Sequence, residues 1–358
     1  QWVDDPPFNT DPLADNTLAL ALSHGNPAGT AYEAVGYAPD DERLSFPETM
    51  AASYPHLMRR FASLFDGEDA PNMALILSPY GKAGMGSHGD ADVSQSRAPL
   101  VFHGPGIASG RVETAANHVD VAPTLAALLG VEPVLGIDGR TGRWTDNLML
   151  QWQDGVVLES VLQDACAYGA AQHGLVLVLD GLNHNELHAG VADGRYPNLA
   201  RILNDEAAVL EGGSIVGWPS YSLPGHVSLL TGAWQGHHGL ISNVFLDRSA
   251  GESGPGTSLQ DMLLYADRAA AVMSEYLSPE VETIFEAVAR SRTSPALASV
   301  NELTTRGATW TGMGAPHPPP PTELSIYAMA DELGIGRAEM FFEEVGVPDL
   351  MVVSLYLP

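Results

Sequence analysis

The sequence predicts an α/β protein whose central, mostly parallel sheet is flanked by helices. Two stretches of the chain alternate short apolar runs, typical of buried strands, with helix-like segments. Hydrophobic residues make up 45% of the 358 positions, enough to bury the core of one large or two ordinary domains. No apolar run approaches the ~20 residues that cross a bilayer, so we expect no membrane segment.

The first stretch predicts two strands and a helix. Residues 73–77 and 99–103 are short apolar runs of strand length. Residues 121–129 predict a helix that Asp120 caps and Gly130 ends. We expect both strands to belong to the sheet.

The second stretch contains two predicted strands and two predicted helices. Residues 175–179 are an apolar strand, and a helix begins at 198–204. Residues 227–231 are expected in a helix that follows a Pro-Gly turn. The run 350–357 is typical of a buried strand, and open α/β sheets place their chemistry at the carboxyl end of such strands.

The charge balance bears on the possible substrates and partners. A formal net charge of −28 argues against stable nucleic-acid binding, which needs patches of Lys and Arg. A small polyanionic substrate would still need local positive charge, and bound metal ions can supply it. Cys166 is the single cysteine, so an intrachain disulfide is excluded; this slightly favours a cytoplasmic protein without excluding a secreted one. The compartment and the oligomeric state stay open.

Three residues carry candidate chemistry in the second stretch. Asp180 follows the strand 175–179, at the sheet edge where metal ligands are common, although it could simply cap the next turn. Ser222 precedes a helix, whose N–H groups and dipole can stabilise a phosphate; the alternative is a helix cap without chemistry. Asn243 offers an amide that could hold a phosphate oxygen.

These residues stand within five motifs of the second stretch. The motifs are Leu-Val-Leu-Asp-Gly at 177–181, Tyr-Pro-Asn-Leu-Ala at 196–200, Ser-Leu-Pro-Gly-His at 222–226, Ser-Leu-Leu-Thr-Gly at 228–232 and His-His-Gly-Leu-Ile-Ser-Asn at 237–243. Together they resemble the type I phosphodiesterase/nucleotide pyrophosphatase family of the alkaline phosphatase superfamily. The resemblance implies that Asp180 is a zinc ligand, Ser222 the metal-bound nucleophile and Asn243 a phosphate-binding amide. His226 matches a family histidine near the site and is expected to support or pack it, whereas Gly225 departs from the common Asn.

The first stretch resembles the other end of the same family. The motifs are Gly-Ser-His-Gly-Asp at 86–90, Arg-Ala-Pro-Leu-Val-Phe-His-Gly-Pro-Gly at 97–106 and His-Val-Asp-Val-Ala-Pro-Thr-Leu at 118–125. The resemblance implies that His88 ligates zinc. The family order is therefore swapped, which suggests a circular permutation with one site shared by His88 and Asp180. A tandem protein with two half-sites is the rival explanation.

The resemblance implies an alkaline-phosphatase-like sandwich with its segments in permuted order. Residues 1–150 would correspond to its carboxyl-terminal part, 151–170 to a connection, and 171–358 to its amino-terminal part. The less regular range 249–325, with prolines at 318–321, would be a lid or cap. An Asp…His pair and an Asp-His-Gly motif that the family carries do not appear, so we expect a truncation at the carboxyl end.

The predicted function is hydrolysis of a small phosphate ester or nucleotide by a phosphodiesterase or nucleotide pyrophosphatase. By resemblance, two divalent ions, expected to be zinc, would support attack by Ser222 on phosphorus and a phosphoseryl intermediate. A catalytically silent binding or structural member is one alternative. A sulfatase is another, since Ser222-Leu223-Pro224 begins the sulfatase pattern, but His226 stands where that pattern requires Arg.

Overall fold

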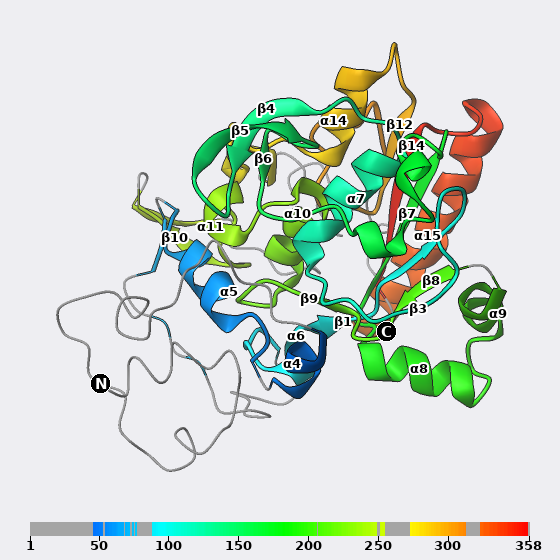
Figure 1. The fold of residues 1–358 in the computed structure, drawn as a ribbon, viewed down its shortest axis with the longest axis horizontal. Helices are drawn as coiled ribbons and strands as arrows, with labels where there is room; N and C mark the ends of the chain where they lie inside the picture. Colours follow the sequence, from blue (N-terminus) through cyan, green and yellow to red (C-terminus); the bar gives the residue numbers. More distant parts are fainter. Residues whose placement is uncertain are drawn as a thin grey trace.

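A computed structural model shows the arrangement of the chain (Figure 1). The residues that it describes are 46–52, 54–67, 69–71, 74, 76, 88–205, 207–248, 251–254, 273–312 and 323–356. The predicted strand 73–77 and the proline run at 318–321 lie largely or wholly outside these residues. Within them, no helix combines the length and the apolar character that a membrane crossing requires.

A four-stranded parallel sheet is the centre of the fold. Its order is β13 (Trp310–Gly312), β12 (Leu297–Val300), β14 (Leu350–Tyr356) and β7 (Gly174–Asp180). The register of β14 on β7 runs from Leu350 opposite Gly174 to Tyr356 opposite Asp180. The strands predicted at 175–179 and 350–357 are thus confirmed, apart from residue 357, which is not described.

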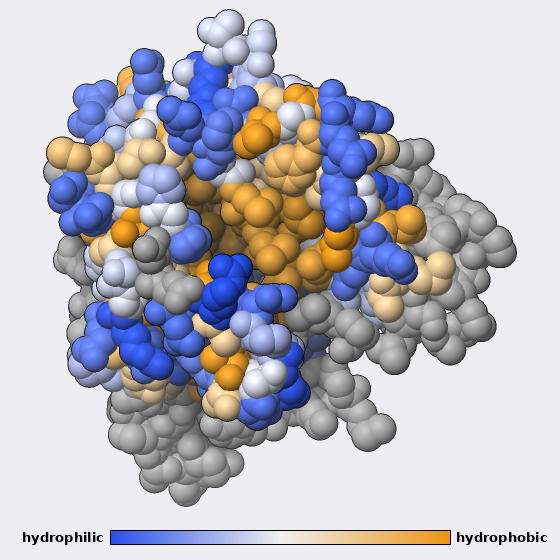
Figure 2. All heavy atoms as spheres, turned by 90° about the vertical axis from the view of Figure 1, so that its right-hand side faces the viewer, coloured by the Kyte–Doolittle hydropathy of each residue, from blue (hydrophilic) through white to orange (hydrophobic). Residues whose placement is uncertain are grey.

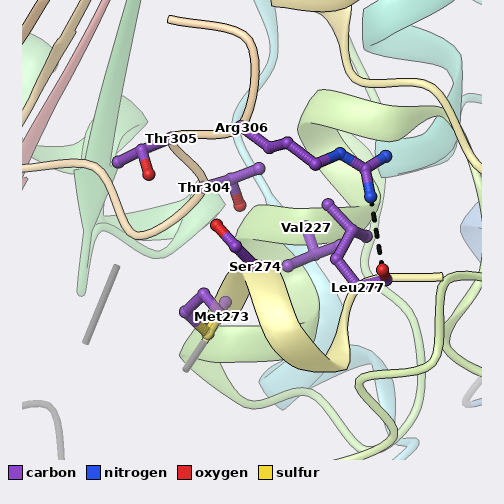
Figure 3. A pocket seen from close by; sticks show the side chains of 7 residues that line it. All are labelled: Val227, Met273, Ser274, Leu277, Thr304, Thr305 and Arg306. Atoms are coloured by element: carbon purple, nitrogen blue, oxygen red, sulfur yellow. Dashed lines mark hydrogen bonds between the residues drawn. The ribbon is translucent and has the colours of Figure 1, made fainter. Parts of the chain in front are cut away.

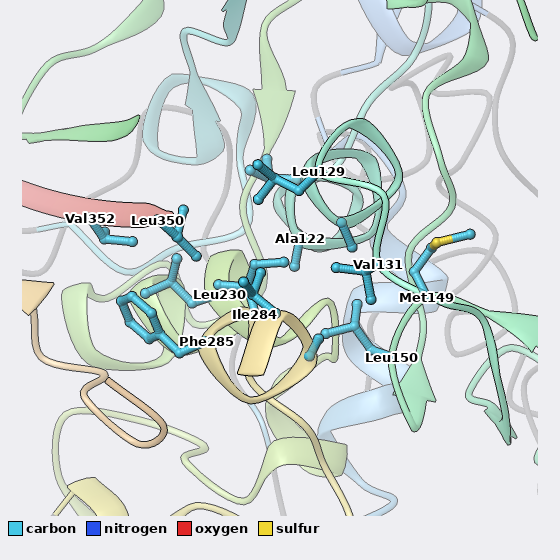
Figure 4. Packing of buried hydrophobic residues seen from close by; sticks show 14 of the residues in the cluster. Ala122, Leu129, Val131, Met149, Leu150, Leu230, Ile284, Phe285, Leu350 and Val352 are labelled. Atoms are coloured by element: carbon cyan, nitrogen blue, oxygen red, sulfur yellow. The ribbon is translucent and has the colours of Figure 1, made fainter. Parts of the chain in front are cut away.

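Helices cover both faces of this sheet, and the main core lies on one of them. On that face α7 (Val121–Leu128), α10 (Ser222–Thr231) and α14 (Ile284–Ser291) pack their apolar residues against β12 and β14 (Figure 4). On the other face α15 (Glu323–Glu344) packs against β14 and β12. The predicted α/β class with a parallel sheet between helices is confirmed, and it is consistent with an alkaline-phosphatase-like fold.

Strand β7 is the edge of the described sheet, and it is only partly covered. Its Leu175 and Leu177 are 64% and 49% exposed, on the same face as α15, since they lie opposite Met351 and Val353. Figure 2 shows the side of the molecule that faces right in Figure 1, where apolar residues line a hollow. The sheet therefore exposes apolar surface at the edge that carries Asp180.

Smaller sheets lie around the centre. The first joins β2 (Val101–His103), β8 (Ala207–Leu210) and β3 (Gly110–Val112), with β2 antiparallel and β3 parallel to β8. The second joins β5 (Arg143–Leu148), β4 (Val134–Asp138) and β6 (Trp152–Gln153). The strand predicted at 99–103 is present as β2, but its antiparallel partner could not be read from its own residues.

The remaining elements are short. The two-stranded pairs are β1 (Arg97–Ala98) with β9 (Ser214–Ile215) and β10 (Phe245–Asp247) with β11 (Glu252–Gly254). The other α-helices are α4 (Phe46–Ala51), α5 (Leu57–Leu64), α6 (Val93–Ser96), α8 (His184–Ala192), α9 (Pro197–Asp205) and α11 (Gln235–His238). The predicted helix at 198–204 is confirmed as α9.

Asp120 occupies the N-cap position of α7 as predicted, but its side chain makes no capping hydrogen bond to that helix. Its carboxylate instead accepts the backbone N–H of Asn117 at 2.7 Å, across the 3-10 turn His118–Asp120, and that of Val156 at 2.9 Å. The physical reason is that an extra turn precedes α7, and the carboxylate of Asp120 accepts its hydrogen bond from that turn. Asp120 thereby ties this turn to the chain at 156.

Part of the range predicted as a lid or cap is built into the sheet. Within 249–325, the described residues include α14, β12 and β13, and both strands join the central sheet. Residues 255–272 and 313–322 of that range lie outside the described residues. The described part of this range therefore includes two strands of the central sheet.

Candidate active site

Asp180 and Ser222 meet at the carboxyl end of β7. The Ser222 hydroxyl donates to Asp180 Oδ2, with Oγ and Oδ2 3.0 Å apart. Asp180 is the last residue of β7, and Ser222 is the first residue of α10. Both side chains are half-buried, so the pair is held by the fold yet open to solvent. A hydroxyl hydrogen-bonded to a carboxylate at a helix N-terminus is a suitable setting for a nucleophile.

The start of α10 differs from its predicted position. Residues 227–231 are helical as predicted, but the helix already begins at Ser222, so Pro224 and Gly225 form its first turn rather than a separate one. Proline fits there because its missing N–H has no helical partner to lose. Of the first-turn N–H groups, that of Leu223 donates to Asn243 Oδ1 at 3.1 Å, and no bond from the Ser222 N–H is found among the described residues.

Asn243 lies beside the same helix end. Its Oδ1 accepts the Leu223 N–H, and this bond fixes the plane of the amide. Among the described residues no hydrogen bond engages its NH₂ group, so the amide can donate to a ligand oxygen. Asn243 thus lies at the end of α10 that begins with Ser222, and its contact with phosphate stays a prediction.

His88 comes from the opposite end of the chain to the same place. Its Nδ1 lies 3.0 Å from the carbonyl oxygen of Ser220, and its ring meets Tyr221 edge-on with centroids 5.6 Å apart. Since a carbonyl can only accept, Nδ1 carries a proton and donates this bond. Metal-binding histidines are commonly oriented in this way.

The ionisation of Asp180 is set by its neighbours. Burial raises the pKa of this carboxyl, but the charge of His226, the Ser222 hydroxyl and the charge of His88 outweigh it and lower the pKa below the usual value. Asp180 is therefore ionised at neutral pH, as an acceptor of the Ser222 proton or a metal ligand must be.

His226 connects Asp180 to a carboxylate deeper in the fold. Its Nε2 lies 3.8 Å from Asp180 Oδ2, and its Nδ1 donates to Glu302 Oε2 at 2.9 Å. Burial opposes a charge on this imidazole, but Glu302 and Asp180 raise its pKa to about 10. Glu302, fully buried beside this cation, has a lowered pKa even though burial alone would raise it.

Glu302 was not among the predicted site residues. A signal was available, because Glu302 comes two residues after β12, and strand ends on one sheet edge converge. The same rule pointed to Asp180, but the flanking apolar run at 297–300 is short and contains Ser299. The hydrogen-bond partner of Glu302, His226, is far away in the sequence.

A second buried carboxylate–imidazole pair lies at the other end of α10. His237 Nδ1 donates to Asp154 Oδ2 at 2.7 Å, and its Nε2 lies 3.2 Å from Oδ2 of the exposed Asp66. Asp154 also accepts the N–H of Trp234, just beyond the helix. His237 itself lies in α11, beyond the carboxyl end of α10, whereas Ser222 begins α10.

The described residues offer a partial set of metal ligands. Nowhere among them do three or more His, Cys, Asp or Glu side chains gather in a geometry that would hold an ion. Asp180 Oδ2 and Ser222 Oγ nevertheless lie 3.0 Å apart, and His88 uses Nδ1 for the Ser220 carbonyl, so Nε2 is the ring nitrogen that could meet a ligand. Oxygen and imidazole donors of this kind suit zinc.

A hollow behind α10 is unsuited to substrate. Figure 3 shows its lining, with Arg306 donating to the carbonyl of Leu277 at 3.2 Å. Val227 from α10 and Met273 contribute apolar walls. The hollow has no room for a water-sized ligand.

Comparison with known proteins gives one family. The model of the family described as type I phosphodiesterase / nucleotide pyrophosphatase matches residues 175–341, a range that includes Asp180, Ser222 and Asn243. No curated protein matches the chain. The family supports hydrolysis of a phosphate ester.

Proposed function

We propose that the chain hydrolyses phosphate diesters or pyrophosphates through Ser222, since residues 175–341 match the model of the type I phosphodiesterase/nucleotide pyrophosphatase family. The observation that carries the proposal is the bond from Ser222 Oγ to the ionised Asp180 at the start of α10. A small phosphate ester or nucleotide would reach this pair from solvent, because both side chains are half-buried.

Each residue of the site has a proposed task. Asp180 accepts the proton of the Ser222 hydroxyl, and Oγ attacks phosphorus to give a phosphoseryl intermediate as the leaving oxygen departs. Asn243 donates its NH₂ group to a non-bridging phosphate oxygen, and the Ser222 N–H adds a second donor. A water molecule then attacks phosphorus and the bond from phosphorus to Oγ breaks; Oγ takes back the proton held by Asp180, and one proton of the water passes to solvent.

Two divalent ions, zinc by the chemistry of the donors, are part of the proposal. Asp180, Ser222 and His88 would hold them as part of a larger ligand set. Such ions neutralise phosphate charge and make a serine hydroxyl more acidic. His88 is presented for this role by the Ser220 carbonyl, which fixes its ring.

The meeting of His88 with the loop before Ser222 supports a single composite site. The charge of His88 acts on Asp180, so the first and second stretches of the chain contribute to the same place. We therefore keep the permuted order of segments as part of the proposal, in preference to two half-sites of a tandem protein.

One observation favours a second candidate, a catalytically silent member that binds without turnover. The described residues supply fewer than three clustered metal-ligating side chains of the His, Cys, Asp or Glu type. Such a member would retain less than one zinc per chain after dialysis against zinc. No feature of the site favours a sulfatase, since His226 is bound to Glu302 and not to the site opening.

The test is turnover of bis-nitrophenyl phosphate by the wild-type chain and by Ser222→Ala. We expect nitrophenol release to be abolished in Ser222→Ala, and mass spectrometry of acid-quenched wild type to show one added phosphoryl group on the peptide with Ser222. Ser220→Ala is the matched control, because its hydroxyl donates to the Asp90 carbonyl at 2.9 Å and not to Asp180. Equal turnover by wild type and Ser222→Ala would refute the proposal, and no turnover together with less than one zinc would favour the silent member.

A further inference from the structure

Glu302 is buried, and hydrogen bonds also hold both oxygens of its carboxylate. Its Oε1 accepts the N–H groups of Leu303 and Thr304 at 2.7 and 3.0 Å, and its Oε2 accepts Ser354 Oγ and His226 Nδ1. Four donors therefore fix both oxygens of a side chain that has no exposed surface. An ionised carboxylate in such a place is costly unless every oxygen is bonded, and here each one is.

The fixed carboxylate of Glu302 orients the imidazole ring of His226. The bond from Nδ1 to Glu302 sets the plane of the imidazole and turns Nε2 toward Asp180. His226 lies four residues after Ser222 on α10, so both side chains are on one face of the helix.

The side chains of Ser222 and His226 both approach the same oxygen of Asp180. Ser222 Oγ lies 3.0 Å and His226 Nε2 lies 3.8 Å from Asp180 Oδ2. The other Asp180 oxygen, Oδ1, has no such neighbour among the described residues. The direction of the imidazole therefore biases which way the carboxylate faces.

We propose that Glu302 is a positioning residue that orients Asp180 toward Ser222 by holding the imidazole of His226. Glu302 itself does not touch the substrate. Strands β12 and β7 are separated by β14, and the chain Glu302–His226–Asp180 spans that gap beneath the site. The inference deepens the proposed function and rests on it for its catalytic consequence, but the geometric part stands on contacts alone.

The test compares Glu302→Gln with wild type in the full chain by three measurements. Proton NMR should show a downfield imidazole N–H signal that His226→Gln and Glu302→Gln both remove. Zinc affinity, measured by competition with a chromogenic chelator, should fall about tenfold, and kcat for bis-nitrophenyl phosphate about 10–100-fold with a smaller change in KM. The double variant should lose no more than His226→Gln alone, because the effect passes through that ring.

A matched control separates positioning from a loss of stability. Asp154→Asn removes the charge from the other buried carboxylate–imidazole pair, so it should lower the unfolding midpoint yet leave zinc affinity unchanged. If Glu302→Gln does not fold, Ser354→Ala removes one donor to Glu302 and should cause a smaller loss in the same direction.

The possible results separate a failure of the positioning role from a failure of the proposed hydrolysis. Unchanged zinc affinity in folded Glu302→Gln, or a loss that adds to that of His226→Gln, would overturn the proposal. If wild type does not turn over the ester but zinc affinity and the NMR signal respond as expected, the positioning role stands and the proposed hydrolysis fails. If the ester is turned over and Glu302→Gln changes neither kcat nor zinc affinity, the hydrolysis stands and the positioning role fails.

Discussion

Two buried carboxylate–imidazole pairs lie near α10, one with its histidine within that helix and one with its histidine in α11, and they differ in what the second ring nitrogen meets. His226, bonded to Glu302, turns Nε2 to Asp180 beside Ser222, whereas His237, bonded to Asp154, turns Nε2 to the exposed Asp66. In both pairs burial disfavours charge, and the carboxylates still raise the histidine pKa to about 10. The same chemical unit thus serves a candidate site in the first pair and joins two segments of the chain in the second.

The largest expected effect is on stability at the Asp154 end. Asp154→Ala should lower the free energy of unfolding by about 3–5 kcal/mol, because it leaves the His237 charge buried and the Trp234 N–H without its acceptor. Urea unfolding followed by tryptophan fluorescence measures this. A loss below ~1 kcal/mol would mean that the pair is not buried as described.

The next effect is on activity at the Glu302 end. His226→Ala should lower kcat/KM for bis-nitrophenyl phosphate about 100-fold, since Asp180 loses the group that orients it. His237→Ala is the matched variant and should change kcat/KM less than about threefold in the folded fraction. Equal losses of kcat/KM in both variants would show that the two pairs do not differ in their effect on catalysis.

The pH dependence of stability tests the charge on His237. Its folded pKa of about 10 lies above the ordinary value of 6.5, so its stabilisation is complete below pH 6.5 and is lost as pH rises toward 10. We expect the difference in unfolding free energy between wild type and His237→Gln to shrink between pH 7 and pH 10. A constant difference over that window would show a neutral imidazole.

The smallest effect should come from Asp66. Its side chain is 61% exposed, so its contact with His237 is screened by solvent and Asp66→Asn should cost only about 0–1 kcal/mol. The change is measurable as a small decrease in the urea midpoint that added salt abolishes. A larger, salt-insensitive loss would instead assign Asp66 a structural role comparable to that of Asp154.

Sequence patterns predicted those parts of the fold that depend on nearby residues. The apolar run at 175–179 and the described part of the run at 350–357 are strands, and the motif residues Asp180 and Ser222 lie in contact. Partners set by the tertiary fold were not predicted, such as the bond between Glu302 and His226. Asp120 shows the same limit, because its carboxylate binds N–H groups of a turn and of a distant residue in preference to its own helix.

The register of β14 on β7 has a consequence for the order in which the molecule acquires its site. Gly174 pairs with Leu350, and the bond that Ser354 gives to Glu302 requires the last described strand. Contacts of such long sequence separation form slowly, because a large loop must close first. During synthesis, the chain up to Glu302 would already contain Asp180, Ser222 and Glu302, but β14, which supplies Ser354, is made later. Competence would therefore appear only when β14 inserts, and partly made chains would be inert.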